Sequence, residues 1–513
     1  MNFMNYLKET LDEEYNVSVT ENGALGYRTS GKALMDINFA VSSMRNMKES
    51  DIKNKFAKAF YEDKLLAMKW LFFARDREAI GERRLFRICM KFLVEEQLEV
   101  ARAVLQLVPY YGRWDDLWGL LYTPLKTDIV EIVNKQLMSD IEYESKGKPI
   151  SLLAKWLPSE NTSSVATKQT AKIMRENLGF TPREYRKILS KLRRHLKVVE
   201  TYMSAKEWNA IDYEAVPSRA NLIYNAAFLR NDEERRREYL SSLEKGQAKI
   251  NAGVLFPHDI VHKYSDGSRW YASVKSKDDT ALEEMWKALP DYVKDAGNTI
   301  CVADGSGSMT VTVGGTQISA LEVANALAIY FAERSSGQFK DNYITFSKRP
   351  QLVDLSKGKS LREKIGIALR YDEVADTNIE AVFDLILQTA INKKMTQEEL
   401  PQNVLILSDM EFNSCVVANG YGRLNNRLFE EISDKYAEHG YKLPRLVFWN
   451  INSRTGTIPV KENDLGVALV SGFSPAIARM VLSNKTDPFE CLLEQLNVER
   501  YNPVEEVIKN ILH

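Results

Sequence analysis

The sequence predicts an α-helical amino-terminal half followed by a carboxyl-terminal α/β domain of the doubly wound class. From Asp36 onward, apolar residues recur at spacings of three and four, the period of amphipathic helices packed on one another. After Asn298, short apolar runs alternate with helical runs, as βαβ units require. A chain of 513 residues is also too long for one hydrophobic core, so several domains are expected.

Composition excludes several classes of protein. With 44% hydrophobic and 27% charged residues, the chain has the make-up of an ordinary globular protein. Its formal net charge of -1 means that any nucleic-acid surface must be a local patch. Four widely spaced cysteines without a C-x-x-C pair argue against a zinc ribbon and a disulfide-stapled domain. The acidic amino terminus does not resemble a signal peptide, and no apolar run reaches membrane-spanning length. We therefore expect a reducing, cytoplasmic setting and no membrane partner.

The amino-terminal half begins with a segment of little periodicity. Residues 1–33 are expected to form an arm that orders only on packing, and residues 34–295 a domain of stacked helices. Gly81 is expected to close one of the first helices before a new basic and acidic run opens the next. Two apolar series mark these helices: Phe56, Phe60, Leu65, Met68, Leu71 and Phe72, then Leu85, Ile88, Phe92, Leu98, Ala101 and Leu105.

The segment 181–197 gives the clearest helix of this half. Thr181 and Glu184 have the spacing of a capping box, and Pro182 stands at the first helical position. One apolar stripe is expected along this helix: Tyr185, Ile188, Leu189, Leu192, Leu196 and Val199.

The other faces of this helix carry seven bases against one acid. They are either an ordinary solvated surface or a surface that contacts phosphates, since Lys and Arg supply the sequence-independent part of nucleic-acid affinity through counterion release. Sequence alone leaves both interpretations open. The candidate RNA-binding residues are Arg183, Arg186, Lys187, Lys191, Arg193, Arg194 and Lys197.

The carboxyl-terminal half predicts a parallel-rich sheet covered by helices on both faces. A capping box of Ser319 and Glu322 marks the start of its first helix. Strands are expected at 299–303, 343–346, 351–354 at an edge, 404–408, 446–450 and 467–471. Helices are expected at 319–334, 378–391, 425–438, 475–483, 487–496 and 503–512.

The first of these strands ends in the motif D-x-S-x-S, at Asp304, Ser306 and Ser308. A carboxylate and two hydroxyls on one tight loop are hard oxygen donors, which suit Mg²⁺, Mn²⁺ or Ca²⁺ rather than zinc or copper. Gly305 and Gly307 let the backbone turn sharply between them. The alternative interpretation of the motif is a serine-rich turn.

The motif resembles the metal-ion-dependent adhesion site of von Willebrand factor A domains. That resemblance implies a threonine and a second aspartate from later loops, and Thr377 and Asp409 fit these roles because each lies at the edge of a predicted helix or strand. The carboxyl ends of neighbouring parallel strands converge on one crevice, so the three loops are expected to meet there. The implied ligands of a divalent cation, with Mg²⁺ favoured and Mn²⁺ or Ca²⁺ as alternatives, are Asp304, Ser306, Ser308, Thr377 and Asp409.

Both halves together resemble a known domain order. The strings ARDREAIGERRLF, YYGRWDDLW, YRKILSKLRRHL, GNTICVADGSGSM, LILSDMEF and ALVSGFSP occur in sequence. They resemble a TROVE-like family with a carboxyl-terminal von Willebrand A domain, found in phages, bacteria, plants and large viruses and related in architecture to the Ro ribonucleoprotein. The resemblance implies a HEAT-like helical repeat over 34–295 and a Rossmann-like A domain over 296–513. For a virus-encoded chain, the expected cytoplasm is that of the host.

The Ro resemblance implies a noncatalytic scaffold that binds noncoding or structured RNA through a ring or horseshoe of helical repeats. The near-neutral charge departs from a strongly basic RNA binder. A second hypothesis is a metal-dependent protein-interaction module, in which an acidic residue of a protein partner completes the coordination of the cation. We predict no enzyme and no catalytic residues, because the sequence lacks a G-x-S-x-G elbow and the GKS at 358–360 lacks the upstream glycine of a phosphate-binding loop.

Overall fold

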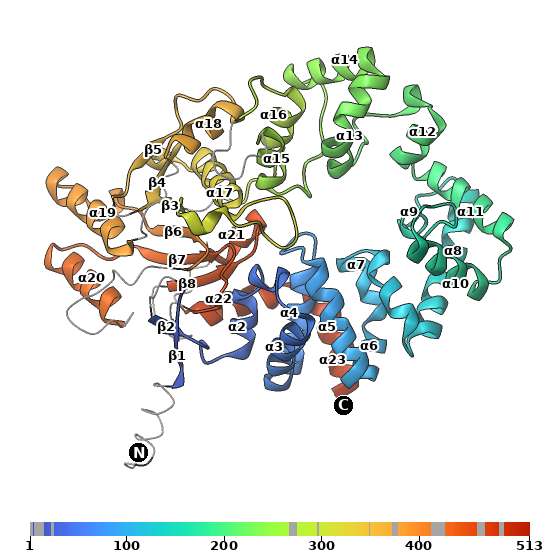
Figure 1. The fold of residues 1–513 in the computed structure, drawn as a ribbon, viewed down its shortest axis with the longest axis horizontal. Coiled ribbons are helices and arrows are strands. Elements are labelled where there is room, and N and C mark those ends of the chain that lie inside the picture. The colour runs from blue at the N-terminus through green and yellow to red at the C-terminus, as the bar shows by residue number, and fades with distance from the viewer. Residues whose placement is uncertain are drawn as a thin grey trace. The chain divides into compact units, whose positions relative to one another are not determined.

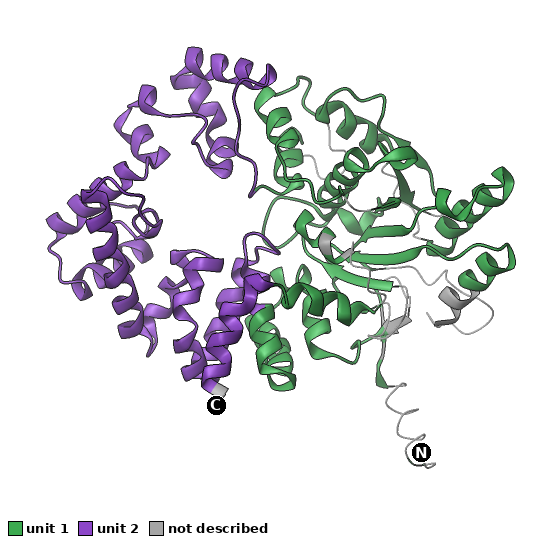
Figure 2. Ribbon diagram, turned by 180° about the vertical axis from the view of Figure 1, so that it is seen from behind, with its two compact units in different colours: residues 1–70, 255–498 green, residues 71–254, 499–513 purple. Residues whose placement is uncertain are grey.

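The contacts within the chain divide it into two compact units, described here from a computed structural model (Figure 2). The sheet unit comprises Met1–Trp70 and Leu255–Val498, and the helical unit comprises Leu71–Val254 and Glu499–His513. Both units are therefore built from segments that are far apart in sequence. The structure describes residues 4, 15–21, 25–265, 274–294, 297–347, 349–371, 378–411, 426–458, 467–481 and 487–512.

The sheet unit is organised on a six-stranded mixed sheet (Figure 1). Its strand order is β5-β4-β3-β6-β7-β8, and all neighbouring pairs are parallel except β4 and β5. Every residue of β3 and of β8 is buried, which explains why these strands read as continuous apolar runs in the sequence. The strands are β3 (Thr299–Asp304), β4 (Asn342–Phe346), β5 (Leu352–Asp354), β6 (Asn403–Ser408), β7 (Arg445–Asn450) and β8 (Val467–Ser471).

Helix α17 (Ala320–Arg334) packs against β3, β4 and β6. Its start confirms the predicted capping box, because the Ser319 hydroxyl accepts a hydrogen bond from the Glu322 amide and the Glu322 carboxylate accepts one from the Ser319 amide. The unit's other helices are α2 (Ala33–Phe39), α3 (Glu49–Glu62), α15 (Pro257–Tyr264), α16 (Thr280–Lys287), α18 (Leu361–Ala368), α19 (Ile379–Lys393), α20 (Asn426–Glu438), α21 (Ala478–Val481) and α22 (Pro488–Leu496).

The amino-terminal arm of this unit contains a β-hairpin. Strands β1 (Val17–Val19) and β2 (Leu25–Tyr27) pair in antiparallel register. Tyr27 then exchanges two backbone hydrogen bonds of 2.9 Å with Ile458, in the loop that follows β7. This hairpin is therefore docked on a loop more than four hundred residues away in sequence.

Helix α4 (Lys64–Arg75) leads into the helical unit, where α11 carries the predicted basic face. The predicted capping box of Thr181 and Glu184 at the start of α11 is confirmed. Tyr185, Leu189 and Leu192 of the predicted apolar stripe on α11 are buried. The helices of this unit are α5 (Arg83–Glu96), α6 (Leu98–Ala103), α7 (Val108–Tyr111), α8 (Lys126–Ser145), α9 (Leu153–Trp156), α10 (Val165–Asn177), α11 (Pro182–His195), α12 (Val199–Ala205), α13 (Ser218–Asn231), α14 (Glu233–Glu244) and α23 (Asn502–Leu512).

A buried ion-pair network connects α4, α5 and the turn that follows α7. The Asp116 carboxylate accepts hydrogen bonds from Arg75 and Arg87, each at 2.8 Å. The side chains of Asp116 and Arg75 are 0% and 4% exposed, so the pair lies in the core. Asp115 beside it pairs with Arg113 at 2.8 Å and remains 20% exposed.

The segment Glu499–His513 closes the helical unit rather than the sheet unit. Tyr111 donates a 2.7 Å hydrogen bond to the carbonyl oxygen of Arg500. Asp76 accepts hydrogen bonds from the Arg500 guanidinium and, at 3.0 Å, from the Tyr501 hydroxyl. Helix α23 also packs against α6. These contacts anchor the last helix on residues from the start of the unit.

Most elements expected from the sequence are present within one or two residues of their predicted ends, with a few differences. The sequence pattern does not predict helix α18, because three of its eight residues are charged and its interior includes Gly366. Helix α4 ends at Arg75, so Gly81 lies in the following loop, where its φ of +81° suits glycine. Among the described residues, no helix is long and apolar enough to cross a membrane.

Candidate metal centre

The sheet places two aspartates at the carboxyl ends of adjacent strands. Asp304 is the last residue of β3, and Asp409 directly follows β6. These two strands are parallel neighbours, and chain order reverses between them, because β4 and β5 lie to one side and β7 and β8 to the other. In open α/β sheets, ligands bind at this switch point. The switch point predicted from the sequence therefore lies between β3 and β6.

The Asp304 carboxylate is held by its own loop and by the next strand. One oxygen accepts a 2.9 Å hydrogen bond from the Ser306 amide, and the other accepts a 2.6 Å bond from the Ser408 hydroxyl. The residue is only 1% exposed. The carboxylate is thus fixed in orientation at the sheet edge.

The two serines connect this carboxylate to the second aspartate. The hydroxyl oxygens of Ser306 and Ser308 lie 2.9 Å apart. Ser308 stands on the 3-10 turn Gly307–Thr310, and its side chain acts to lower the pKa of the Asp409 carboxyl. Four of the five ligands predicted from the sequence, Asp304, Ser306, Ser308 and Asp409, are therefore brought together.

The fifth predicted ligand, Thr377, lies outside the described residues. The residue that follows it, Asn378, caps helix α19 by accepting a 3.1 Å hydrogen bond from the Ala381 amide.

The electrostatics of the two aspartates favour a cation. Burial raises the pKa of Asp304 above its usual range. Burial, and then the neighbouring Asp304 charge, raises the pKa of Asp409 to about 7, although Ser308, the Glu411 amide and Arg454 act in the opposite direction. Two buried carboxylates side by side repel each other and are costly to desolvate, and a divalent cation between them relieves both costs. The donor set of carboxylates and hydroxyls fits a hard cation such as Mg²⁺.

A second set of contacts beside the site was not predicted from the sequence. Glu411 is 2% exposed, and its carboxylate accepts hydrogen bonds from the amides of Arg454 at 2.7 Å and Thr455 at 2.9 Å. It also accepts a 2.7 Å bond from the Glu21 amide of the amino-terminal arm. Glu411 therefore joins the β6 loop, the β7 loop and the arm.

Among the residues that the structure describes, no three or more His, Cys, Asp or Glu side chains are grouped so that they could hold a metal ion. A cation at the edge of β3 and β6 would accordingly rely on the two aspartates, the serine hydroxyls and water.

Three of the candidate RNA-binding residues on α11 contact other parts of the protein. Arg193 is directed inward and donates to the carbonyl oxygens of Ala154 at 2.8 Å and Leu157 at 2.7 Å, so its guanidinium is a structural group. Lys191 and Arg194 pair with Glu144 and Glu207, at 2.5 Å and 3.3 Å.

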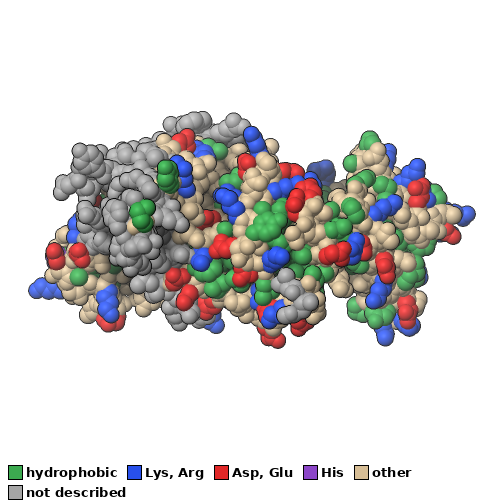
Figure 3. All heavy atoms as spheres, turned by 90° about the horizontal axis from the view of Figure 1, so that it is seen from below, with side chains coloured by type: hydrophobic (Ala, Val, Ile, Leu, Met, Phe, Trp, Pro, Cys, Tyr) green, Lys and Arg blue, Asp and Glu red, His purple; other side chains and the backbone are tan. Residues whose placement is uncertain are grey.

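The remaining bases of this helix lie on its outer faces. Arg186 donates to the carbonyl oxygen of Pro182 at 3.1 Å. Arg183, Lys187 and Lys197 are exposed. On the face drawn in Figure 3, basic and acidic side chains are interspersed, which agrees with the near-zero net charge.

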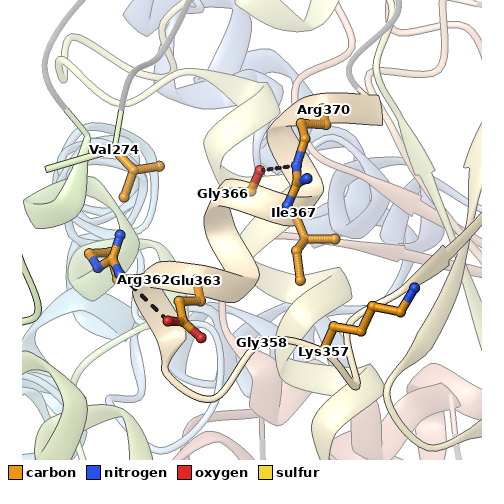
Figure 4. Close-up of a pocket in the computed structure, with 8 residues that line it drawn as sticks. All are labelled: Val274, Lys357, Gly358, Arg362, Glu363, Gly366, Ile367 and Arg370. Atoms are coloured by element: carbon orange, nitrogen blue, oxygen red, sulfur yellow. Dashed lines mark hydrogen bonds and ion pairs between the residues drawn. The ribbon is translucent and has the colours of Figure 1, made fainter. Parts of the chain in front are cut away.

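A cavity of about 400 Å³ lies elsewhere in the sheet unit, along α18 and the loop before it (Figure 4). Its lining includes Lys357, Arg362 and Arg370. Arg362 pairs with Asp278 at 2.6 Å, and Arg370 donates to the carbonyl oxygen of Gly366 at 3.2 Å. Since two of these three cations already have acceptors in the protein, the cavity is a weaker anion site than its basic lining suggests.

Fold and site together define a protein with a helical unit and an open α/β unit that carries paired acids at the switch point of its sheet. Two family models match the chain, each described as a domain of unknown function: DUF2828 over residues 160–299 and DUF7788 over residues 298–509. The chain is 32% identical to "Uncharacterized protein L728" of Acanthamoeba polyphaga mimivirus over 531 residues, which cover 95% of this chain and 89% of that protein. The chain belongs to the family of this mimivirus protein, in agreement with the expectation of members in large viruses.

Proposed function

We propose that the sheet unit is a von Willebrand A-like module that binds a divalent cation, with Mg²⁺ favoured, and uses it to capture an acidic group of a protein partner. The observation that carries the proposal is the meeting of the buried Asp304 and Asp409 carboxylates at the switch point between the parallel neighbours β3 and β6. The function proposed is binding and not catalysis.

Three features of the site support this proposal. All donors are oxygens, which excludes the soft ligands that zinc and copper prefer. The donors present supply fewer ligands than the six of an octahedral cation, so water or a partner's carboxylate must complete the shell. The site also lies where open α/β sheets bind their ligands. In this arrangement Asp304 and Asp409 hold the cation, and Ser306 and Ser308 fill neighbouring positions.

The test is calorimetric titration of the full chain with Mg²⁺ and Mn²⁺. Asp304→Asn and Asp409→Asn are expected to weaken binding by at least about tenfold, since each removes a charged ligand. The matched control is Glu438→Gln, an exposed acid at the end of α20, which should bind as the wild type does. Unchanged affinity in both aspartate variants would refute the proposal.

Misfolding of the variants can be separated from loss of the ligand. Because Asp409 is buried beside Asp304, replacing its charge with an amide should raise the melting temperature in the absence of divalent cations. A variant that is more stable and no longer binds Mg²⁺ has lost a ligand and not its fold.

A second candidate function is a Ro-like RNA scaffold built on a TROVE-like helical unit. It is favoured by the exposure of Arg183, Arg186 and Lys187 on one helix, which supplies phosphate-contacting groups. Electrophoretic mobility of structured RNA at low salt tests it. The triple variant with glutamine at these three positions should lose binding, whereas Arg237→Gln on α14 should not. If the wild-type protein does not bind RNA, the RNA-scaffold function is excluded.

A further inference from the structure

Arg454 lies between the candidate metal centre and the amino-terminal arm. It follows β7, and one of its terminal nitrogens, Nη2, contacts two carboxylates. The contact with Glu21 of the arm is 2.6 Å, and the contact with Asp409 is 3.4 Å. The same nitrogen thus joins the arm to a predicted metal ligand.

The backbone around Arg454 is held firmly. Its own amide donates to Glu411 at 2.7 Å, and the next residue, Thr455, donates to the same carboxylate from its amide and its hydroxyl. Glu411 and Asp409 are separated by one residue, so this anchor fixes Arg454 relative to the site. The Arg454 side chain is 31% exposed, and its Nη2 contacts both carboxylates.

The arm is docked on the same loop by contacts other than Glu21. Ser18 and Thr457 have hydroxyl oxygens 3.1 Å apart, and Tyr27 pairs with Ile458 through two backbone bonds. The Glu21 amide is bound by Glu411 at 2.7 Å. Glu21 therefore lies two residues after β1, in an arm that is docked on the same loop as Arg454.

We propose that Arg454 is a switch side chain that couples cation binding to docking of the amino-terminal arm. Without a divalent cation it shares its charge between Asp409 and Glu21. A cation bound by Asp409 repels the guanidinium, which then pairs with Glu21 alone and strengthens the hold on the arm. This inference rests on the proposed metal site, and it names Arg454 and Glu21 as positioning residues that regulate that site.

The coupling makes opposite predictions for the two charges. Arg454→Gln removes a cation that competes for Asp409, so Mn²⁺ should bind at least about threefold more tightly. Glu21→Gln removes the alternative partner of Arg454, so Mn²⁺ should bind at least about threefold more weakly. Arg454→Lys, which keeps the charge, should stay closer to the wild type.

A double-mutant cycle separates the switch from a simple field effect. If Glu21 acts through Arg454, the loss caused by Glu21→Gln should shrink when Arg454 is already glutamine. An equal loss in both backgrounds would mean that Glu21 acts only through space and would overturn the proposal. Electron paramagnetic resonance measures the Mn²⁺ affinity of the wild type, the two single variants and the double variant, with Glu438→Gln as the control.

The second readout is hydrogen exchange in the arm, because coupling is reciprocal. Saturating Mg²⁺ should increase the protection of the amides in β1 and β2 in the wild type, and this increase should be lost in Arg454→Gln. Unchanged or reduced protection would overturn the switch.

The same measurements separate failure of the switch from failure of the metal site. If Mn²⁺ binds and its binding requires Asp304, but neither Arg454→Gln nor Glu21→Gln alters the Mn²⁺ affinity, only the switch proposal is refuted. If no variant and no wild-type protein binds Mn²⁺, the metal site fails and the switch with it.

Discussion

The Ser408 hydroxyl donates a 2.6 Å hydrogen bond to the Asp304 carboxylate, from the last residue of β6 to the last residue of β3. Both residues are buried, and the Met410 amide in turn donates to the Ser408 hydroxyl at 3.0 Å. Ser408 therefore orients the Asp304 carboxylate and the start of the β6 loop at once.

Ser408→Ala should lower the stability of the sheet unit by about 1–3 kcal/mol, because it leaves a buried carboxylate with one donor fewer. It should also weaken Mg²⁺ binding, since Asp304 loses its fixed orientation. Chemical denaturation and titration calorimetry measure the two effects. Ser433→Ala, at an exposed position of α20, is the control and should alter neither.

The effect of Mg²⁺ on stability should depend on pH. The folded-state pKa of Asp409 is raised to about 7, so protonation of this group stabilises the fold, and that stabilisation is lost as pH rises through the folded-state value. Mg²⁺ requires the deprotonated carboxylate. The increase in melting temperature caused by Mg²⁺ should consequently be several degrees at pH 8, where a cation at 100 times its Kd adds about 2.7 kcal/mol, and much smaller at pH 5.5.

Scanning calorimetry with and without chelator checks this dependence, and Asp409→Asn serves as the matched variant. Its Mg²⁺ effect should be small at both pH values. A shift of equal size at pH 5.5 and pH 8 in the wild type would argue that the cation binds elsewhere.

Two adjacent arginines of α11 should respond differently to the same change. Arg193→Gln should destabilise the helical unit by about 2–4 kcal/mol, because its three hydrogen bonds to the segment 154–159 are lost and two carbonyl oxygens lose a donor. Arg194→Gln removes an exposed pair with Glu207 and should cost less than about 1 kcal/mol. Urea denaturation measures both. Similar values for the two variants would contradict the inward placement of Arg193.

The two aspartates of the buried network form a comparable pair. Asp116→Ala leaves the guanidinium of Arg75 buried without its main partner and should cost about 3–5 kcal/mol. Asp115→Ala removes a partly exposed acid, and its cost should be clearly lower. Far-ultraviolet circular dichroism during denaturation follows both changes, and a smaller cost at Asp116 than at Asp115 would refute the assignment.

The strands were predictable because their chemistry is local. Strands β3, β6 and β8 are buried along nearly their whole length, so each appears in the sequence as an uninterrupted apolar run with a polar end. The resemblance to von Willebrand A domains implied a second aspartate, and the rule that parallel strand ends converge placed Asp409 beside Asp304.

The contacts that surround the site were not predictable in this way. Glu21 and Glu411 are 390 residues apart, and nothing in the composition of the arm indicates where it docks. In α11, periodicity identified the buried stripe but did not show that Arg193 reaches inward past it. Side-chain pairing between distant segments depends on tertiary geometry, and a single sequence does not encode it in any local pattern.

Because Glu499–His513 belongs to the helical unit, this unit cannot be completed until the end of the chain has been translated. The residues that receive this segment, such as Asp76 and Tyr111, leave the ribosome several hundred residues before Arg500 and Tyr501. At a translation rate of about 5–20 residues per second, Glu499–His513 is synthesised roughly tens of seconds after the residues that it contacts. The helical unit is therefore translated early but completed late, after every strand of the sheet has emerged.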